Sequence, residues 1–194
     1  MAENKVKFGL KNVHLFPIEE EDSNEIKYSA KPIVLPGAVN LSLSPEGDEN
    51  PFYADDIVYY NSYANNGYSG DLEIALITEE FYTEILGQTK DANGALVESV
   101  NDKTKSFAMT FEFQGDKNAK RCILYKVSVG RPNDEHQTIG ETKEPQTETL
   151  SVRVMARMND GLVKASVKEG GTGYDTFFTT VYEPKITETS SRQG

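Results

Sequence analysis

Residues 107–129 read FAMTFEFQGDKNAKRCILYKVSV, and the pattern of this stretch decides the fold. On either side of a polar centre, large apolar side chains alternate with small or polar ones. Successive side chains of a β-strand point to opposite faces of a sheet, so this alternation is typical of half-buried strands. The segment Gly115-Asp116-Lys117-Asn118 between the two halves is typical of a turn. The stretch therefore predicts an antiparallel hairpin.

The same alternation predicts four more strands. Residues 39–43 and 71–76 alternate in this way, and so do residues 150–156 and 163–167. The last two runs are separated by Asn159-Asp160-Gly161, and Asp-Gly is a tight-turn signal. We therefore expect these two runs to pair with each other as a second hairpin.

One short helix is predicted over residues 79–86. Thr78 can cap it, Glu79 and Glu80 place negative charge at the positive end of the helix dipole, and Gly87 can end it. Apolar residues spaced four apart give the helix one apolar face. We expect that face to pack on a sheet.

Together these elements predict a mainly β protein. We expect an antiparallel β-sandwich with one short flanking α-helix, a long inter-strand loop and extended terminal arms. The 194 residues suit one domain, which we place at residues 1–184, with the loop at 44–70 and a polar C-terminal arm at 185–194.

The loop 44–70 reads SPEGDENPFYADDIVYYNSYANNGYSG and shows no clear periodicity. A structureless loop of this length is uncommon in a compact domain, yet its aromatic content argues against disorder. Its rings need cover, which a neighbouring subunit can supply, because tyrosine and phenylalanine are enriched at protein interfaces. The predicted subunit interface consists of Pro45, Phe52, Tyr53, Ile57, Tyr59, Tyr60, Tyr63 and Tyr68.

No motif for catalysis is found. There is no nucleophile elbow, Walker loop or dinucleotide-binding glycine motif, and His14 and His136 are interpreted as surface or structural residues. The single cysteine, Cys122, is interpreted as a small buried hydrophobe, so a Cys-based metal cage is excluded. A glycosidase-like pair of acids stays open, since a sequence does not show the distance between carboxylates. We predict that the protein is not an enzyme, with no metal site and no cofactor.

Charge and hydropathy limit the partners. A net charge of −11 disfavours tight binding of nucleic acid, which depends on lysine and arginine neutralising phosphates, but it suits a surface along which DNA slides without adhering. No apolar run approaches the roughly 18 residues of a membrane span, and the N-terminus lacks the apolar stretch of a secretion signal. We expect synthesis in a cytosol and no membrane binding.

Three segments of the chain resemble the major tail proteins of phages with long, non-contractile tails. They are residues 5–14, KVKFGLKNVH; residues 36–47, PGAVNLSLSPEG, running into 51–55, PFYAD; and residues 65–77, NNGYSGDLEIALI. Weaker similarity continues at residues 144–150 and at 177–182, where an aromatic strand or turn is expected. The resemblance spans nearly the whole chain.

The resemblance implies a structural subunit of a tail tube. In that family six copies of a helix-flanked β-sandwich close into a ring, and the stacked rings form a hollow tube that conducts the viral genome during ejection. The implied partners are the chain itself, the tape measure, terminator and baseplate components, and DNA as a passing cargo. The implied location is the virion, after assembly in the host cytoplasm. Loop 44–70 would contact neighbouring subunits and adjacent rings.

Under this hypothesis some acidic residues line the channel. Asp71, Glu73 and Glu112 alternate with apolar residues and are candidates to keep DNA from adhering. Lys120, Arg121, Arg153 and Arg157 have equally exposed registers, so the sequence does not show which face of the sheet turns inward. An alternative function is a carbohydrate-binding or adhesion module of a virion or cell surface, because tyrosine rings also stack on sugars.

Overall fold

The computed structural model describes residues 3–138 and 145–185. These residues form a mainly β, sandwich-like fold with one short helix, α1 (Glu79–Glu84). The strands are β1 (Lys7–Glu21), β2 (Ile26–Tyr28), β3 (Ile33–Leu35), β4 (Ala38–Pro45), β5 (Glu49–Ala54), β6 (Ile57–Tyr63), β7 (Tyr68–Ile74), β8 (Thr89–Lys90), β9 (Leu96–Val97), β10 (Phe107–Gly115), β11 (Lys120–Val129), β12 (Glu148–Met155) and β13 (Lys164–Lys168).

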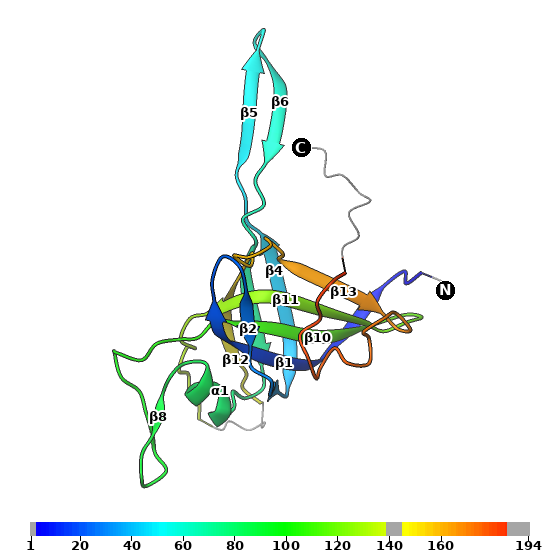
Figure 1. Cartoon of the computed structure of the whole chain (residues 1–194). Helices are drawn as coiled ribbons and strands as arrows, with labels where there is room; N and C mark the ends of the chain where they lie inside the picture. The colour runs from blue at the N-terminus through cyan, green and yellow to red at the C-terminus, as the bar shows by residue number, and fades with distance from the viewer. Residues whose placement is uncertain (1–2, 139–144, 186–194) are drawn as a thin grey trace.

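One large antiparallel sheet has the strand order β2-β1-β10-β11-β12-β7-β4, with β3 added beside β1 and β13 beside β11. The sheet bends so that β12, β7 and β4 run crosswise to β1, β10 and β11 (Figure 1). The two halves of the bent sheet therefore face each other like the layers of a sandwich, and their inner faces enclose the core.

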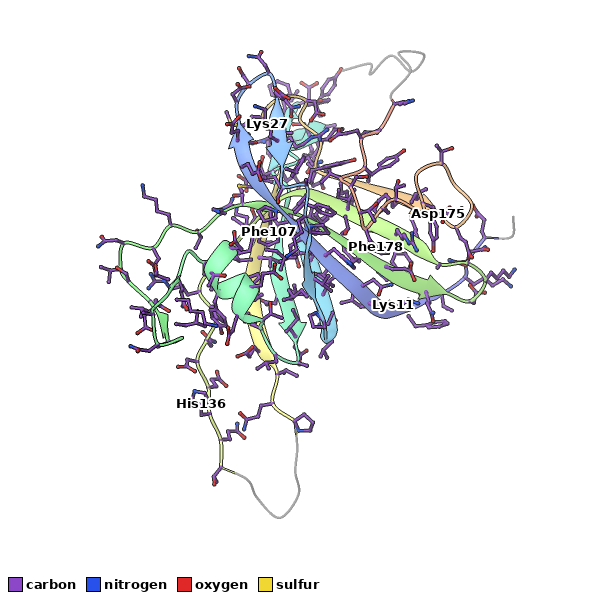
Figure 2. The ribbon with its side chains drawn as sticks, turned by 60° about the horizontal axis from the view of Figure 1, so that its bottom comes forward. Lys11, Lys27, Phe107, His136, Asp175 and Phe178 are labelled. Atoms are coloured by element: carbon purple, nitrogen blue, oxygen red, sulfur yellow. The ribbon has the colours of Figure 1, made fainter. Side chains whose placement is uncertain are left out.

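The central hairpin is confirmed. Strands β10 and β11 pair antiparallel, with Phe107 opposite Val127 and Thr110 opposite Ile123. Alternate residues of β10 serve two cores: Phe107 and Met109 belong to the larger cluster, whereas Ala108 belongs to a smaller one on the other face. Phe107 accordingly lies near the middle of the molecule (Figure 2).

The larger cluster joins both halves of the sheet to the helix. It consists of buried residues of β1, β3, β7, β10, β11 and β12 together with the α1 region. The predicted cap is confirmed, because the Thr78 hydroxyl accepts a hydrogen bond from the Phe81 amide at 3.3 Å. Phe81 is fully buried, so the apolar face of the helix packs on the sheet as expected. The helix ends at Glu84 with Ile85 as its C-cap, slightly before the predicted end.

The C-terminal segment covers the outer face of β10 and β11. Residues 170–180 form a series of turns, so the aromatic region there is a turn and not a strand. Phe177 is fully buried in the smaller cluster and stacks on Tyr182 with ring centroids 5.4 Å apart. The predicted arm at 185–194 lies outside the described residues apart from Lys185.

The predicted second hairpin is wrong. Strands β12 and β13 do not pair with each other; they lie end to end along β11, with Val127 opposite Val154 and Ile123 opposite Ala165. A turn at Asn159-Asp160-Gly161 does exist, and it is closed by the hydrogen bonds from the Arg157 amide to the Leu162 carbonyl and from the Gly161 amide to the Arg157 carbonyl. The turn directs the chain to a new stretch of the same neighbour, β11, instead of folding it back on β12.

The predicted long loop 44–70 contains regular structure, because most of it is a β-hairpin. Strands β5 and β6 pair antiparallel and project away from the body of the protein (Figure 1). This projecting hairpin, residues 49–63, extends the ladder of the edge pair β4 and β7. Backbone hydrogen bonds from the Glu46 amide to the Gly67 carbonyl and from the Ala64 amide to the Asp48 carbonyl bridge the two ladders.

Candidate functional site

The projecting hairpin turns at two aspartates. Asp55 and Asp56 both have positive φ, 51° and 61°, and the ladder closes with Ala54 opposite Ile57. Positive φ at both central residues is the geometry of a type I′ turn, whose twist matches that of the flanking strands. Aspartate tolerates this conformation better than most residues, so this turn can form without glycine.

Gly67 fixes the hairpin to the body. It is buried, its φ is +94°, and a Cβ at this position would lie 2.0 Å from the carbonyl oxygen of Val154. Only glycine allows the backbone to pass this close to β12 in this conformation. The base of the hairpin therefore packs closely against β12.

The large apolar side chains of the hairpin are exposed. Their exposed fractions lie between 52% and 73%, whereas the exposed large apolar side chains of the body are scattered over several elements and most of its apolar residues lie in two clusters. The exposed side chains are those of Phe52, Tyr53, Ile57, Val58, Tyr59, Tyr60 and Tyr63. A concentration of exposed apolar groups on one element indicates an interaction surface.

Both faces of the hairpin carry such groups. In the ladder Phe52 lies opposite Tyr60, and Tyr53 lies opposite Val58. Since Phe52 and Tyr53 are consecutive in one strand, these two pairs point to opposite faces. A two-stranded ribbon has no core of its own and is marginally stable alone in water. Cover from a partner on each side would therefore stabilise it.

Two of the predicted interface residues lie at the base of the hairpin instead. Pro45 ends β4 directly opposite Tyr68 in β7. Tyr68 is half-buried, packs against the larger cluster and has the ammonium group of Lys164 4.2 Å from its ring centroid. Its ring is thus partly covered within the chain, and only the other six predicted residues project freely.

The three candidates for a channel lining differ in their exposure to solvent. Asp71 is exposed and accepts a hydrogen bond from the Ser151 hydroxyl at 3.0 Å, and Glu73 is half-buried and accepts one from Thr147 at 2.7 Å. Both alternate with buried residues of β7, so both face outward. They remain candidates for a lining.

Glu112, in contrast, is only 4% exposed, and the expectation that it faces solvent is wrong. Its carboxylate pairs with Lys11 at 3.1 Å and with Arg121 at 2.8 Å. The Arg121 guanidinium in turn lies 3.8 Å from the ring centroid of Tyr174 in the C-terminal segment. Glu112 faces outward from β10, but the C-terminal turns cover it, and a strand-alternation argument does not detect such cover.

The Glu112 cluster should make the stability of the fold depend on pH in the acidic range. Burial opposes ionisation of Glu112, but the hydrogen bonds from Arg121 and Lys11 outweigh it and hold its pKa below the ordinary value of 4.5. A lowered folded-state pKa stabilises the fold above the unfolded-state pKa, and this contribution is lost as the pH falls through the folded value.

We therefore expect Glu112→Gln to lower the free energy of unfolding at pH 7, with a difference from wild type that shrinks as the pH falls below about 4.5. Urea unfolding of both proteins from pH 7 to pH 3 measures this difference. A difference that stays constant over the whole range would show that the ionised carboxylate contributes nothing to stability.

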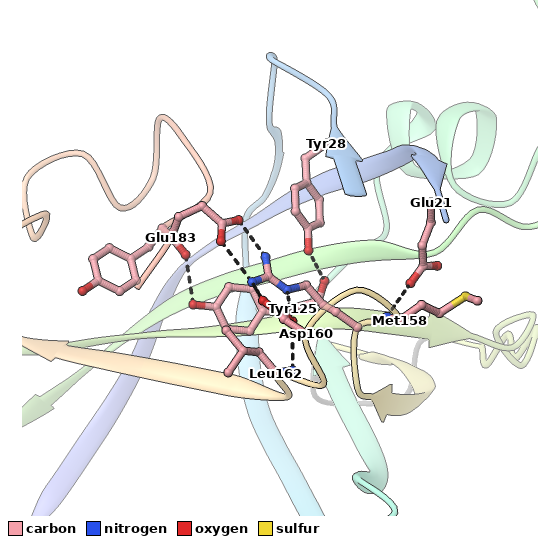
Figure 3. Close-up of polar contacts among 9 residues, drawn as sticks. Glu21, Tyr28, Tyr125, Met158, Asp160, Leu162 and Glu183 are labelled. Carbon is pink, nitrogen blue, oxygen red and sulfur yellow. Dashed lines mark hydrogen bonds and ion pairs between the residues drawn. The ribbon is translucent and has the colours of Figure 1, made fainter. Parts of the chain in front are cut away.

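A second ionic cluster surrounds Arg157, which is buried although its register looked exposed (Figure 3). Its guanidinium donates to Glu183 at 2.7 and 3.0 Å and to Asp160 at 3.0 Å, and it lies 4.4 Å from the ring centroid of Tyr125. Burial by itself would lower the pKa of Arg157, but the hydrogen bonds to Glu183 and Asp160 outweigh this effect and raise the pKa. The guanidinium therefore stays charged. Burial also raises the pKa of Tyr28, beside this cluster, to about 12.

Sequence reasoning missed one more feature, a groove of about 660 Å³ at one end of the sandwich. Strands β1, β4, β10, β11 and β13 line it, with half-buried apolar side chains and three lysines, Lys7, Lys120 and Lys164. Cys122 also lines the groove and is half-buried, not fully buried as expected. Burial raises the pKa of its thiol, while the charges of the three lysines oppose that rise. The alternating charges along these strands gave no sign that the lysines converge.

The histidines occupy ordinary positions. The His14 ring stacks on Phe178 with centroids 4.8 Å apart, and His136 pairs with Asp134 on an exposed loop that extends away from the sheets (Figure 2). Within residues 3–138 and 145–185, no group of three or more His, Cys, Asp or Glu residues is placed to hold a metal ion. No helix in the same ranges has the length and apolar character needed to cross a membrane.

No protein-family model matches the chain, and no curated protein matches its sequence.

Proposed function

We propose that the chain is a non-catalytic structural subunit that assembles with copies of itself, as a tail tube protein of a phage does. One observation carries the proposal: a projecting hairpin exposes seven large apolar side chains on two faces. Exposing such a surface is unfavourable in water and becomes favourable when copies of the chain cover it. The resemblance of residues 36–47, 51–55 and 65–77 to major tail proteins supports the tube in particular.

In this proposal six copies close into a ring and the rings stack around a channel for the viral genome. In a closed ring of subunits every hairpin has an identical neighbour. No apolar surface is then left exposed, as it would be at the end of an open chain of subunits. The tape measure, terminator and baseplate components would contact the finished tube in the virion. Asp71 and Glu73 are the candidates for an acidic lining along which DNA moves without adhering.

The proposal is tested by electron microscopy of the concentrated, purified chain with no ligand added. We expect rings with a central hole, or tubes built of such rings. Monomers alone, at every concentration and salt condition that keeps the protein soluble, would contradict it.

The second hypothesis, a carbohydrate-binding or adhesion module, rests on the same exposed tyrosines. Binding sites for small ligands are usually concave, whereas these rings lie on a projecting ribbon, which favours assembly. A glycan array distinguishes the two: specific hits that need Tyr59 and Tyr60 would support the binding module instead.

A further inference from the structure

The groove at the end of the sandwich has the opposite chemistry to the projecting hairpin. Residues 44–67 contain five acidic residues and no lysine or arginine; the acids are Glu46, Asp48, Glu49, Asp55 and Asp56. The groove has three lysines and no carboxylate among its lining residues. In a chain of net charge −11, a basic apolar groove is the surface that would attract an acidic apolar ribbon.

Carboxylates of the described residues do not neutralise the lysines of the groove, although the Lys164 ammonium lies 4.2 Å from the ring centroid of Tyr68. Within the described part of the chain no carboxylate forms an ion pair with Lys7, Lys120 or Lys164. An adjoining cavity of about 360 Å³ shares Lys7, Lys120 and Phe113 with the groove and adds Lys5, together with Lys168, which pairs with Glu3 of the same lining at 3.5 Å. Lysines therefore outnumber acidic residues around the apolar groove.

The apolar lining of the groove is also incompletely covered. Phe8 and Val39 are more than half exposed at its rim, and Leu10, Leu41 and Phe111 are half-buried along its walls. These side chains can bury the aromatic rings of a hairpin, just as the larger cluster buries apolar groups inside the sandwich.

Three of the strands that line this groove have an unpaired edge. Among the described strands, β4 pairs only with β7, β13 pairs only with β11, and residues 7–12 of β1 pair only with β10. An unpaired edge is a template for adding a strand from another chain. A β-ribbon is thus a suitable occupant in backbone geometry as well as in charge.

We propose that the groove lined by Lys7, Lys120 and Lys164 is the acceptor for the projecting hairpin of a second copy of this chain. The proposal rests on the proposed self-assembly and names the partner surface within it. The acidic turn at Asp55 and Asp56 contacts the three lysines, and aromatic side chains on one face of the hairpin cover the apolar walls of the groove. The contact is heterologous, with hairpin on one copy and groove on the next, so it closes into a ring or continues into a filament.

The test exploits the single native cysteine, which lies in the groove. One chain carries Ala54→Cys beside the hairpin turn together with Cys122→Ser, and it is mixed with wild-type chain, whose only thiol is Cys122. The mixture is assembled, oxidised at alkaline pH and mapped by mass spectrometry. We expect a disulfide between position 54 and Cys122 at a yield at least about tenfold above that of a control chain carrying Ala92→Cys and Cys122→Ser, because docking raises the effective concentration of the two thiols. A yield equal to the control, or links mainly between two hairpins, would overturn the acceptor assignment.

Charge reversal gives an independent readout without cysteine chemistry. Lys7→Glu with Lys120→Glu should raise the concentration needed for assembly at least about tenfold, because like charges then meet across the contact. Lys103→Glu with Lys105→Glu changes the net charge equally at a loop outside the groove and should have a much smaller effect. If wild-type tubes form and the two variants behave alike, the groove is not the acceptor although self-assembly stands. If wild-type protein forms no rings or tubes, self-assembly itself fails.

Discussion

Replacing Tyr59 and Tyr60 together with alanine is expected to abolish assembly while leaving the free energy of unfolding of the sheet nearly unchanged. Both rings are more than 60% exposed, so their loss creates no cavity in either core. Aromatic anchors buried at an interface contribute about 2 kcal/mol or more each, and two of them correspond to roughly a thousandfold in the association constant. Sedimentation velocity over a concentration series measures assembly, and urea unfolding of the dilute protein measures the stability of the body.

The matched control is Leu76→Ala with Val100→Ala, which removes two exposed apolar side chains outside the hairpin. This variant should assemble like wild type. Normal assembly of the tyrosine variant, or unfolding of its body, would show that these rings are not interface anchors.

Arg157→Met is expected to lower the free energy of unfolding by about 3 kcal/mol, because breaking a buried ionic cluster leaves charges without partners. The Arg157 guanidinium links the turn after β12 to Glu183 at the end of the C-terminal segment. Asp160 and Glu183 are partly exposed and regain some hydration, which keeps the loss at the lower end of the usual range.

Arg153→Met is the control, since Arg153 lies four residues earlier, is mostly exposed and forms one ion pair, with Glu46 at 3.0 Å. A surface pair of this kind contributes at most about 1 kcal/mol. Urea unfolding of the two variants measures the contrast, and equal midpoints would mean that the Arg157 cluster does not hold the C-terminal segment in place.

The alternation of apolar with small or polar side chains predicted many of the strands of the large sheet. Strands β4, β7, β10, β11, β12 and β13 and the capped helix all lie where the pattern indicated. Alternation reports which face of a strand is buried, however, and not which strand is its neighbour. The Asp160-Gly161 signal was therefore correct as a turn and misleading about pairing, because β11 is long enough to bind β12 and β13 one after the other.

The projecting hairpin was missed for a physical reason. Its ribbon is apolar on both faces, so Val58, Tyr59 and Tyr60 form a continuous run in which no alternation is visible. Its turn also uses Asp55-Asp56 in place of a glycine-containing pair, which is the usual hairpin signal. Composition alone indicated that the aromatic rings need a partner, and the structure adds that they lie on one projecting hairpin.

The buried positions of Glu112 and Arg157 and the convergence of lysines in the groove were beyond sequence reasoning. Each depends on a segment far along the chain: the C-terminal turns cover Glu112, Glu183 neutralises Arg157, and β1, β11 and β13 bring Lys7, Lys120 and Lys164 together. No local pattern of residues encodes such a long-range contact.

Hydroxyl-radical footprinting of Tyr59, Tyr60 and Tyr63 tests most directly whether the hairpin rings become buried between copies. The oxidation rate of each side chain is measured by mass spectrometry in dilute, monomeric protein and in assembled tubes, with Val100 as an exposed reference. We expect fast oxidation of the three tyrosine side chains in the monomer and severalfold slower oxidation in the tube, with the rate of Val100 unchanged. Rings that oxidise as fast in the tube as in the monomer, or that are already protected in the monomer, would contradict the account.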